Sequence, residues 1–219
     1  MQLDHPVTHS YQLDAEFPVI PSLGLFNNQP VSNPTRRRLL RLAGASALAL
    51  ALPKPAWSQA DILKSEGFWL VPRTLNYRNL QGQRLKVTYW EDGIVQKSAY
   101  DEINWFMRDR KASQEYVKPM DLRLLDAQYA VGGWLRHFGL SDLMRFHYGA
   151  RDPSRAKSIE GASLTSKHHD GRAIDAGIDG VPNEKYASFG VWLRPGGIGF
   201  YQSKDFTHMD TGPLRAWRG

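Results

Sequence analysis

Hydrophobic and polar positions alternate or recur with helical spacing in the part of the 219-residue chain that follows residue 60. Arg84–Trp90 is rich in β-branched and aromatic residues, and a Glu-Asp-Gly turn signal separates it from Ile94–Val95. This pattern predicts a β-hairpin. Apolar residues recur at near-helical spacing in Ser98–Arg110, which predicts a helix with Ser98 as a candidate N-cap.

A second, longer helix is predicted over Pro119–Phe138. Asp121 can cap its start, because a short side-chain oxygen can accept a hydrogen bond from a free backbone N–H. Leu122, Leu125 and Tyr129 fall on one face at helical spacing, and we expect that face to lie in the core.

The pattern changes after Leu140 to short strand-like pieces separated by glycine-rich turns. These pieces are Met144–Tyr148, Ala173–Ile178, Phe189–Leu193, Ile198–Tyr201 and Phe206–Met209. Helices first and strands later predict an α+β fold, with a mostly antiparallel sheet packed by helices in a single compact domain. Polar residues gather at the ends of these strands, where a rigid scaffold can hold catalytic groups.

Residues 1–60 have the layout of an export signal. An arginine cluster precedes the apolar run Leu42–Leu52, and a small-residue ending follows at Ala60. The apolar run is too short for a bilayer, which takes about 20 residues. We therefore assign 1–60 to an N-terminal extension and signal and 61–219 to a single folded domain, and we expect no stable membrane span after cleavage near Ala60. A buried or amphipathic N-terminal helix is the alternative.

The arginine cluster has a more specific pattern. Thr35–Arg41 reads TRRRLLR and resembles the twin-arginine motif, in which Ser or Thr precedes two arginines, any residue, two bulky apolar residues and a basic residue. Such signals are read by a bacterial machine that exports folded proteins. The resemblance implies the twin-arginine export machinery as a partner and the periplasm as the destination.

Charge and cysteine content narrow the classes of function. The net charge is +6, but residues 1–60 contribute five basic and three acidic side chains, which leaves 23 basic and 19 acidic residues in 61–219. This mild surplus suits an anionic polymer such as a cell wall, and it also suits many proteins with no such partner. With no basic run after Ala60, a nucleic-acid partner is poorly supported. The chain has no cysteine, which excludes disulfides and thiolate zinc sites.

Histidines and aspartates concentrate in two short stretches. They are SKHHDGRAID at 166–175 and DFTHMDTG at 205–212. His168 and Asp175 lie on either side of Gly171, which permits a turn that brings both side chains to one point. On a strand, the small residues Ala173 and Gly177 share the face of Asp175 and leave room for a metal and a peptide. A metal site and a plain polar loop both fit this spacing.

The first stretch matches a known motif at all its fixed positions. SKHHDGRAID resembles the S-x-H-x-x-G-x-A-x-D motif of the zinc D-Ala-D-Ala peptidases. GGIGFY at 196–201 and FTHMDTGPLRAW at 206–217 look like the periplasmic murein endopeptidase branch of that superfamily, the MepK-like branch. In layout the resemblance covers roughly Leu75–Trp217.

The resemblance implies the D-Ala-D-Ala peptidase fold and one zinc ion per chain, held by His168, Asp175 and His208. It also implies hydrolysis of peptide bonds in peptidoglycan stem peptides, often at the meso-diaminopimelate 3–3 cross-link. A D,D-carboxypeptidase on the same fold and a wall-binding protein without catalysis are the alternatives. An intact set of three ligands argues against the binding protein.

Two aspartates are candidates for the general base, which takes a proton from the attacking water and passes it to the leaving amine. Asp205 lies three residues before His208, where related peptidases place an acidic residue. Asp210 lies two residues after His208, on the same face of a strand, and can instead orient that imidazole. We favour Asp205.

Three further polar residues flank the candidate ligands. Arg151 lies in a segment that resembles the family's S-G-Y-R, which implies a contact with a substrate carboxylate, and a surface salt bridge is the alternative. Ser166 has either a substrate or metal-supporting role or caps the turn. We expect His169, next to a candidate ligand, to lie on the surface.

Overall fold

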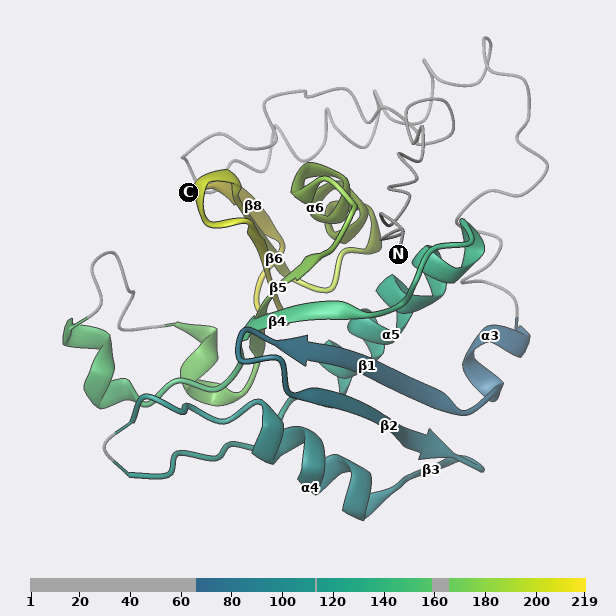
Figure 1. The fold of residues 1–219 in the computed structure, drawn as a ribbon, viewed down its shortest axis with the longest axis horizontal. Coiled ribbons are helices and arrows are strands. Elements are labelled where there is room, and N and C mark those ends of the chain that lie inside the picture. Colours follow the sequence, from purple (N-terminus) through teal and green to yellow (C-terminus); the bar gives the residue numbers. More distant parts are fainter. Residues whose placement is uncertain (1–65, 113, 159–165) are drawn as a thin grey trace, which may run out of the picture.

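The computed structural model describes residues 66–112, 114–158 and 166–219, which form a twisted sheet with helices against it (Figure 1). The helices are α3 (Glu66–Leu70), α4 (Lys97–Phe106), α5 (Leu122–His137) and α6 (Asn183–Leu193). The strands are β1 (Arg73–Asn79), β2 (Arg84–Glu91), β3 (Ile94–Val95), β4 (Met144–Tyr148), β5 (Ala173–Ile178), β6 (Gly197–Tyr201), β7 (Phe206–Asp210) and β8 (Arg215–Arg218). Short 3-10 turns are η1 (Pro153–Ser158), η2 (Lys167–Asp170) and η3 (Gln202–Lys204). The predicted signal in 1–60 lies outside the described residues.

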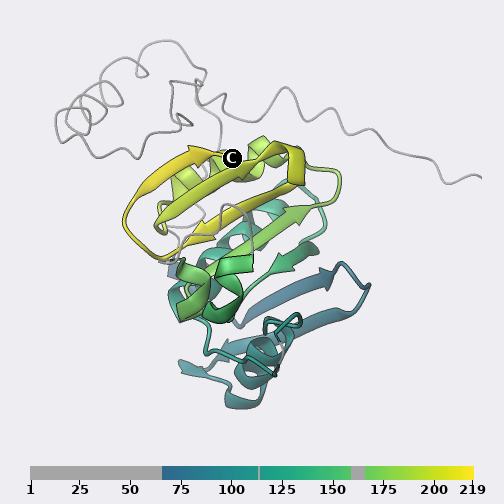
Figure 2. The same ribbon diagram turned by 90° about the vertical axis from the view of Figure 1, so that its left-hand side faces the viewer.

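The strands form one eight-stranded sheet in the order β3-β2-β1-β4-β5-β7-β6-β8. Only the β1–β4 and β6–β8 pairs are parallel, and the other pairs are antiparallel. Figure 2 shows the N-terminal strands at one end of the sheet and β6 and β8 at the other. The predicted α+β fold with a mostly antiparallel sheet is confirmed.

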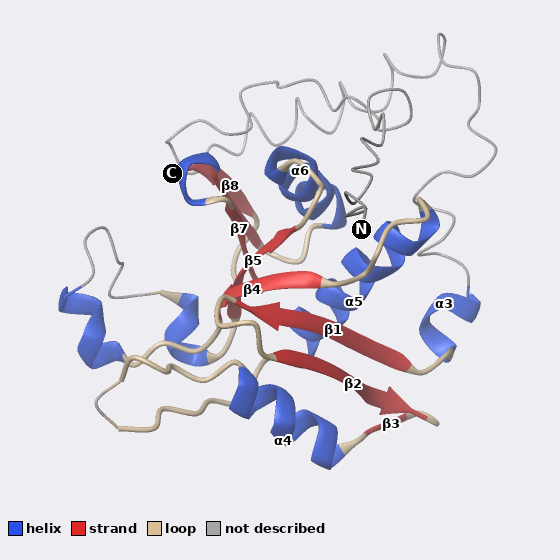
Figure 3. Ribbon diagram, in the orientation of Figure 1, coloured by secondary structure: helices blue, strands red, loops and turns tan. Residues whose placement is uncertain are grey.

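The helices cover one face of the sheet, with α4 beside β2, α5 beside β1, and α6 beside β6 and β7 (Figure 3). Tyr77 of β1 shows that α4 and α5 meet the same face. Its hydroxyl donates to Gln128 of α5 at 2.9 Å, and its ring lies 6.5 Å from that of Phe106 of α4. These buried side chains belong to one continuous core. Within the described ranges, none of the helices is long and apolar enough to cross a membrane.

The central strand β5 divides its side chains between two faces. Ile174, Ala176 and Ile178 lie in the helix-covered core. Because side chains alternate along a strand, Asp175 and Gly177 point to the opposite face. The strand is buried along its whole length, so this second face is also covered at its centre. The candidate ligands lie there.

Several predicted elements are confirmed, with small shifts at their ends. The hairpin of β2 and β3 forms, and Asp121 caps α5 by accepting a hydrogen bond from the Arg123 N–H at 2.9 Å. The cap predicted for α4 is wrong, since Gln96 holds the N-cap position and Ser98 lies inside the helix. Leu122 is 39% exposed, so it does not belong to the buried face of α5.

The strand predicted at Phe189–Leu193 is wrong, because these residues end helix α6. Packing overrides their β-prone composition. Tyr186, Phe189 and Gly190 are buried and lie at helical spacing, as expected for one face of a packed helix. The ring of Phe189 stacks on Trp134 of α5 with centroids 4.6 Å apart. Strand β1 was not predicted, although its burial alternates as a half-covered strand requires.

Candidate metal centre

The three predicted ligands come from one short turn and two paired strands. His168 lies in η2, and Asp175 of β5 stands directly opposite His208 of β7 in the antiparallel register. Gly171 ends η2 with φ +68°, a left-handed conformation that favours glycine. A Cβ at this position would lie 2.2 Å from the Pro119 carbonyl oxygen. This turn returns the chain so that His168 faces the strands, as the sequence predicts.

The three side chains converge on one point. Asp175 Oδ1 lies 2.8 Å from His208 Nδ1 and 3.2 Å from His168 Nε2, and the two nitrogens are 3.2 Å apart. One ligand atom from each residue lies within 4.8 Å of the others, and all three residues are buried. The set has two imidazole nitrogens and one carboxylate, which are ligands that zinc accepts.

Hydrogen bonds on the outer side of each imidazole fix which nitrogen faces the centre. His168 Nδ1 donates to the Gly149 carbonyl oxygen at 2.6 Å, and His208 Nε2 donates to Asp210 Oδ2 at 2.9 Å. Both partners only accept hydrogen bonds, so the opposite nitrogens present lone pairs to the centre. Two lone pairs and a carboxylate that face one another repel unless a metal ion or a proton lies between them. The donor set therefore fits a metal ion.

Asp210 is fully buried beneath His208 and accepts hydrogen bonds only. Its carboxylate accepts from the N–H groups of Gly197 at 3.0 Å and Gly212 at 2.7 Å, and from both terminal nitrogens of Arg215. A Cβ at Gly197 would lie 2.6 Å from this carboxylate, so the glycine leaves the space that Asp210 occupies. Burial raises the pKa of Asp210, but the hydrogen bonds from His208 and Arg215 outweigh it and hold the pKa well below its usual range.

Charge at the centre is strongly coupled. Burial raises the pKa of Asp175, but its electrostatic interactions and hydrogen bonds with His168 and His208 hold the pKa well below its usual range. Burial lowers the pKa of His208, but hydrogen bonds to Asp175 and Asp210 raise it to about 9. Without metal, His208 therefore carries a proton at neutral pH, which a metal ion must displace.

Asp205 lies on the same face of the sheet but outside this cluster. It precedes β7 with φ +51°, and its exposed carboxylate pairs with the Arg145 guanidinium, which also donates to the Asp205 carbonyl oxygen at 3.2 Å. Arg145 passes over Gly177, where a Cβ would lie 2.8 Å from its Nη2. The space over Gly177, which the sequence left for a metal and a peptide, is therefore used by this arginine.

The flanking residues differ from their expectations in part. Arg151 donates its N–H to the His168 carbonyl oxygen at 3.0 Å, and its guanidinium lies 5.9 Å from the Tyr148 ring centroid. Within the described ranges it forms no salt bridge. Ser166 precedes η2 but its side chain makes no capping hydrogen bond, so the cap alternative is wrong. His169 is only 9% exposed, so its surface placement is also wrong.

Three contributors to this face were not predicted from the sequence. Arg145 and His147 lie on β4, where Arg145 Nε donates to His147 Nε2 at 3.3 Å. Burial and Arg145 lower the pKa of His147, while the charges of Asp175 and Asp205 act in the opposite direction. Arg215 reaches Asp210 from β8. The alternation of polar and apolar residues in MRFHY was a usable signal for β4, because it assigns Arg145 and His147 to one face.

Comparison of the chain with known proteins shows which family it resembles. Residues 70–217 match the family model described as peptidoglycan L,D-endopeptidase MepK. The probable peptidoglycan L,D-endopeptidase MepK of Haemophilus influenzae is 29% identical over 187 residues, which cover 84% of this chain and 96% of that protein. Peptidoglycan L,D-endopeptidase MepK of Escherichia coli is 31% identical over 189 residues, which cover 83% and 96%. No solved structure matches the chain.

Proposed function

Since the chain belongs to the peptidoglycan L,D-endopeptidase MepK family, we propose that it is an exported zinc endopeptidase that hydrolyses peptide cross-links of peptidoglycan. Its relatives are named for L,D-endopeptidase activity, which favours the meso-diaminopimelate 3–3 link as the bond that is cut. The role of such an enzyme is remodelling of the cell wall.

The observation that carries this proposal is the arrangement of the three ligand atoms. The residues that the motif marks as ligands meet within 4.8 Å, and both imidazoles are held with a lone pair toward the centre. A wall-binding protein has no need of such a buried, polarised set. The ligands would be His168, Asp175 and His208, with one zinc ion per chain.

Zinc bound here supplies a Lewis acid that polarises the scissile carbonyl and makes water a better nucleophile. The protein residues keep the ligands in place and move protons. Gly149 and Asp210 hold the two imidazoles in the tautomers that present lone pairs. Arg215 and the N–H groups around Asp210 keep that carboxylate ionised and buried, so its role is to orient His208.

Asp205 is the residue we propose as general base. It has an exposed carboxylate on the face of the ligands, where it can take a proton from the attacking water and hand it to the leaving amine. Asp210 is less suited to this task, because every hydrogen bond found for its carboxylate comes from a donor within the fold. The ion pair between Asp205 and Arg145 holds the carboxylate of the proposed base in one position.

Arg151 and Ser166 are proposed to contact the substrate. The backbone N–H of Arg151 donates to the His168 carbonyl oxygen, so the backbone of Arg151 lies next to a candidate ligand. A guanidinium suits the carboxylate of a stem peptide, because its parallel N–H groups match two carboxylate oxygens. Ser166 is half-buried next to η2, with a hydroxyl that does not serve the turn.

Export by the twin-arginine route into the periplasm is part of the proposal. Its support is the TRRRLLR motif at 35–41 and the location of the substrate outside the inner membrane. Replacing Arg36 and Arg37 by lysine should leave the protein in the cytoplasm with its signal uncleaved. Export at the wild-type level would overturn this route without affecting the assignment of the activity.

The enzymatic proposal is tested by digestion of purified sacculi and of isolated cross-linked dimers with the zinc-loaded chain. Mass spectrometry of the products should show dimers converted to monomers, and the His168→Ala chain should leave them intact. Loss of terminal D-Ala alone would indicate a D,D-carboxypeptidase. Intact dimers with zinc verifiably bound would contradict the proposed activity.

A further inference from the structure

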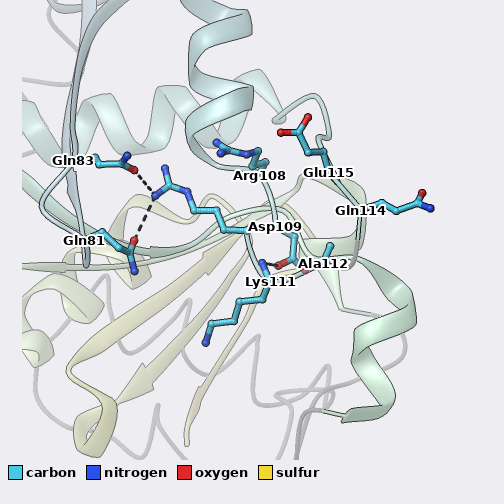
Figure 4. A pocket seen from close by; sticks show the side chains of 9 residues that line it. Gln81, Gln83, Arg108, Asp109, Lys111, Ala112, Gln114 and Glu115 are labelled. Carbon is cyan, nitrogen blue, oxygen red and sulfur yellow. Dashed lines mark hydrogen bonds between the residues drawn. The ribbon is translucent and has the colours of Figure 1, made fainter.

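A pocket of about 680 Å³ is lined by none of the three candidate ligands and has no part in the chemistry described so far. It opens between the turn that joins β1 to β2 and the segment that follows α4. Figure 4 shows Gln81 and Gln83 on one side of the pocket, where hydrogen bonds from Arg110 reach both of their oxygens. Lys111 follows on the same segment as Arg110. The side chains that line it include Gln81, Gln83, Arg108, Asp109, Arg110 and Lys111.

The pocket has an excess of positive charge. Three cations line it, Arg108, Arg110 and Lys111, against the carboxylates of Asp109 and Glu115. Asp109 does not balance them, because it is only 5% exposed and is already bound by the guanidinium of Arg155 and by backbone N–H groups. Burial and the charge of Arg108 lower the pKa of Arg110, as expected for two neighbouring cations.

The neutral side chains of the same pocket offer N–H groups to a ligand that accepts hydrogen bonds. Gln83 Oε1 accepts from Arg110 Nη1 at 2.6 Å, and Gln81 Oε1 lies 3.4 Å from the same nitrogen. Each amide thus uses its oxygen on the arginine and keeps its N–H groups for other partners. Guanidinium and amide N–H groups together suit a ligand that only accepts hydrogen bonds, and a carboxylate is such a ligand.

Tyr148 links the pocket to the metal centre. Lys111 Nζ donates to the Tyr148 hydroxyl at 3.0 Å, and Tyr148 pairs with Asp175 across β4 and β5. The turn with Gln81 and Gln83 follows the end of β1, and β1 lies two strands from β5, which corresponds to about 10 Å across a sheet. An extended peptide covers this distance in about three residues at roughly 3.3 Å each.

We propose that this pocket binds a free carboxylate of the peptidoglycan stem peptide while the scissile bond lies at the metal centre. The inference rests on the proposed function, because it takes the substrate from it. Arg110 is the principal contact, and Lys111 contributes charge at the rim between the pocket and Tyr148. The pocket thereby selects acidic stem peptides over stems whose carboxylates are amidated.

The test compares kinetics on two substrates, cross-linked dimers with free stem carboxylates and the same dimers after amidation. In the full zinc-loaded chain, Arg110→Met and Lys111→Met should each raise KM for the free dimer about three- to tenfold and change kcat little. The amidated dimer should show no such dependence. Arg84→Met removes a matched exposed cation outside the pocket lining and should leave both constants at wild-type values.

Two kinetic results would overturn the pocket while the enzymatic proposal stands. One is an unchanged KM in both pocket variants, and the other is an equal rise in KM for free and amidated dimers.

A binding measurement separates failure of the pocket from failure of the proposed function. A fluorescently labelled dimer is titrated with the catalytically disabled His168→Ala chain, and then with His168→Ala chains that also carry Arg110→Met or Lys111→Met. Weaker binding of the free dimer alone in the double variants supports the pocket, even if the wild-type chain cleaves no dimer. Equal binding by all three chains would overturn it.

Discussion

Replacement of Asp210 by asparagine should weaken zinc binding although Asp210 does not touch the metal position. In the native chain, every group that contacts the carboxylate is a donor: the Gly197 and Gly212 N–H groups and Arg215 Nη1 at Oδ1, and His208 Nε2 and Arg215 Nη2 at Oδ2. An amide must turn its own NH₂ toward one of these two groups of donors.

The amide should place its NH₂ where it meets fewer donors, which is the side that faces His208. There it clashes with the His208 Nε2 proton and favours the tautomer that carries the proton on Nδ1, the nitrogen that faces the centre. Loss of such an orienting carboxylate costs about ten- to a hundredfold in metal affinity, or about 1.4–2.7 kcal/mol. The unpaired buried donors should also lower the free energy of unfolding by about 1–3 kcal/mol.

The assay is chelator competition for zinc at neutral pH on the full chain, with thermal unfolding to establish that the variant is folded. Asp179→Asn is a matched control, because Asp179 is an exposed carboxylate that pairs with Arg78 and Arg145. It should bind zinc as the wild type does. A folded Asp210→Asn chain with wild-type zinc affinity would refute the role given to the Asp210 carboxylate.

Four further predictions follow from the same geometry. His168→Ala should abolish zinc binding and hydrolysis while circular dichroism shows the fold intact, and retained activity would exclude His168 as a ligand. Asp205→Ala should keep zinc but lower kcat about 10²- to 10⁴-fold, whereas near-normal turnover would exclude it as the base. The raised His208 pKa stabilises the zinc-free chain fully below its unfolded value of about 6.5, and this contribution, up to about 3 kcal/mol, is lost as pH rises through about 9. Urea unfolding of the zinc-free chain should show that fall, and a flat profile would contradict the coupling. Gly171→Ala should misplace η2, because its Cβ would meet the Pro119 oxygen at 2.2 Å, and normal zinc affinity in this variant would refute the need for the turn.

The candidate ligands were predictable because much of their geometry is local. His168 and Asp175 are separated by one left-handed glycine and the start of a strand, so spacing alone brings them near each other. His208 comes from a later strand, and its pairing with Asp175 depends on strand register, which no local pattern fixes. The fold class followed from the order of helices and strands.

The rest of the site depends on contacts between distant segments. Arg145 meets Asp205 across 60 residues, and no periodicity in either segment indicates that contact. Helix α6 also depends on a distant contact. The stacking of Phe189 on Trp134 stabilises a helix there, although the local composition is β-prone. The burial of His169 likewise arises from tertiary packing, because the sequence only places it next to a ligand.

The central claim is that this chain cuts peptidoglycan cross-links with a metal held by His168, Asp175 and His208. It is tested most directly by titrating the metal-free chain with zinc while mass spectrometry follows the conversion of a purified 3–3 cross-linked dimer to monomers. The account predicts that the rate rises until one zinc is bound per chain and that the His168→Ala chain produces no monomers at any zinc level. Cleavage that persists in the metal-free chain, or a zinc-loaded chain that releases only terminal D-Ala, would contradict it.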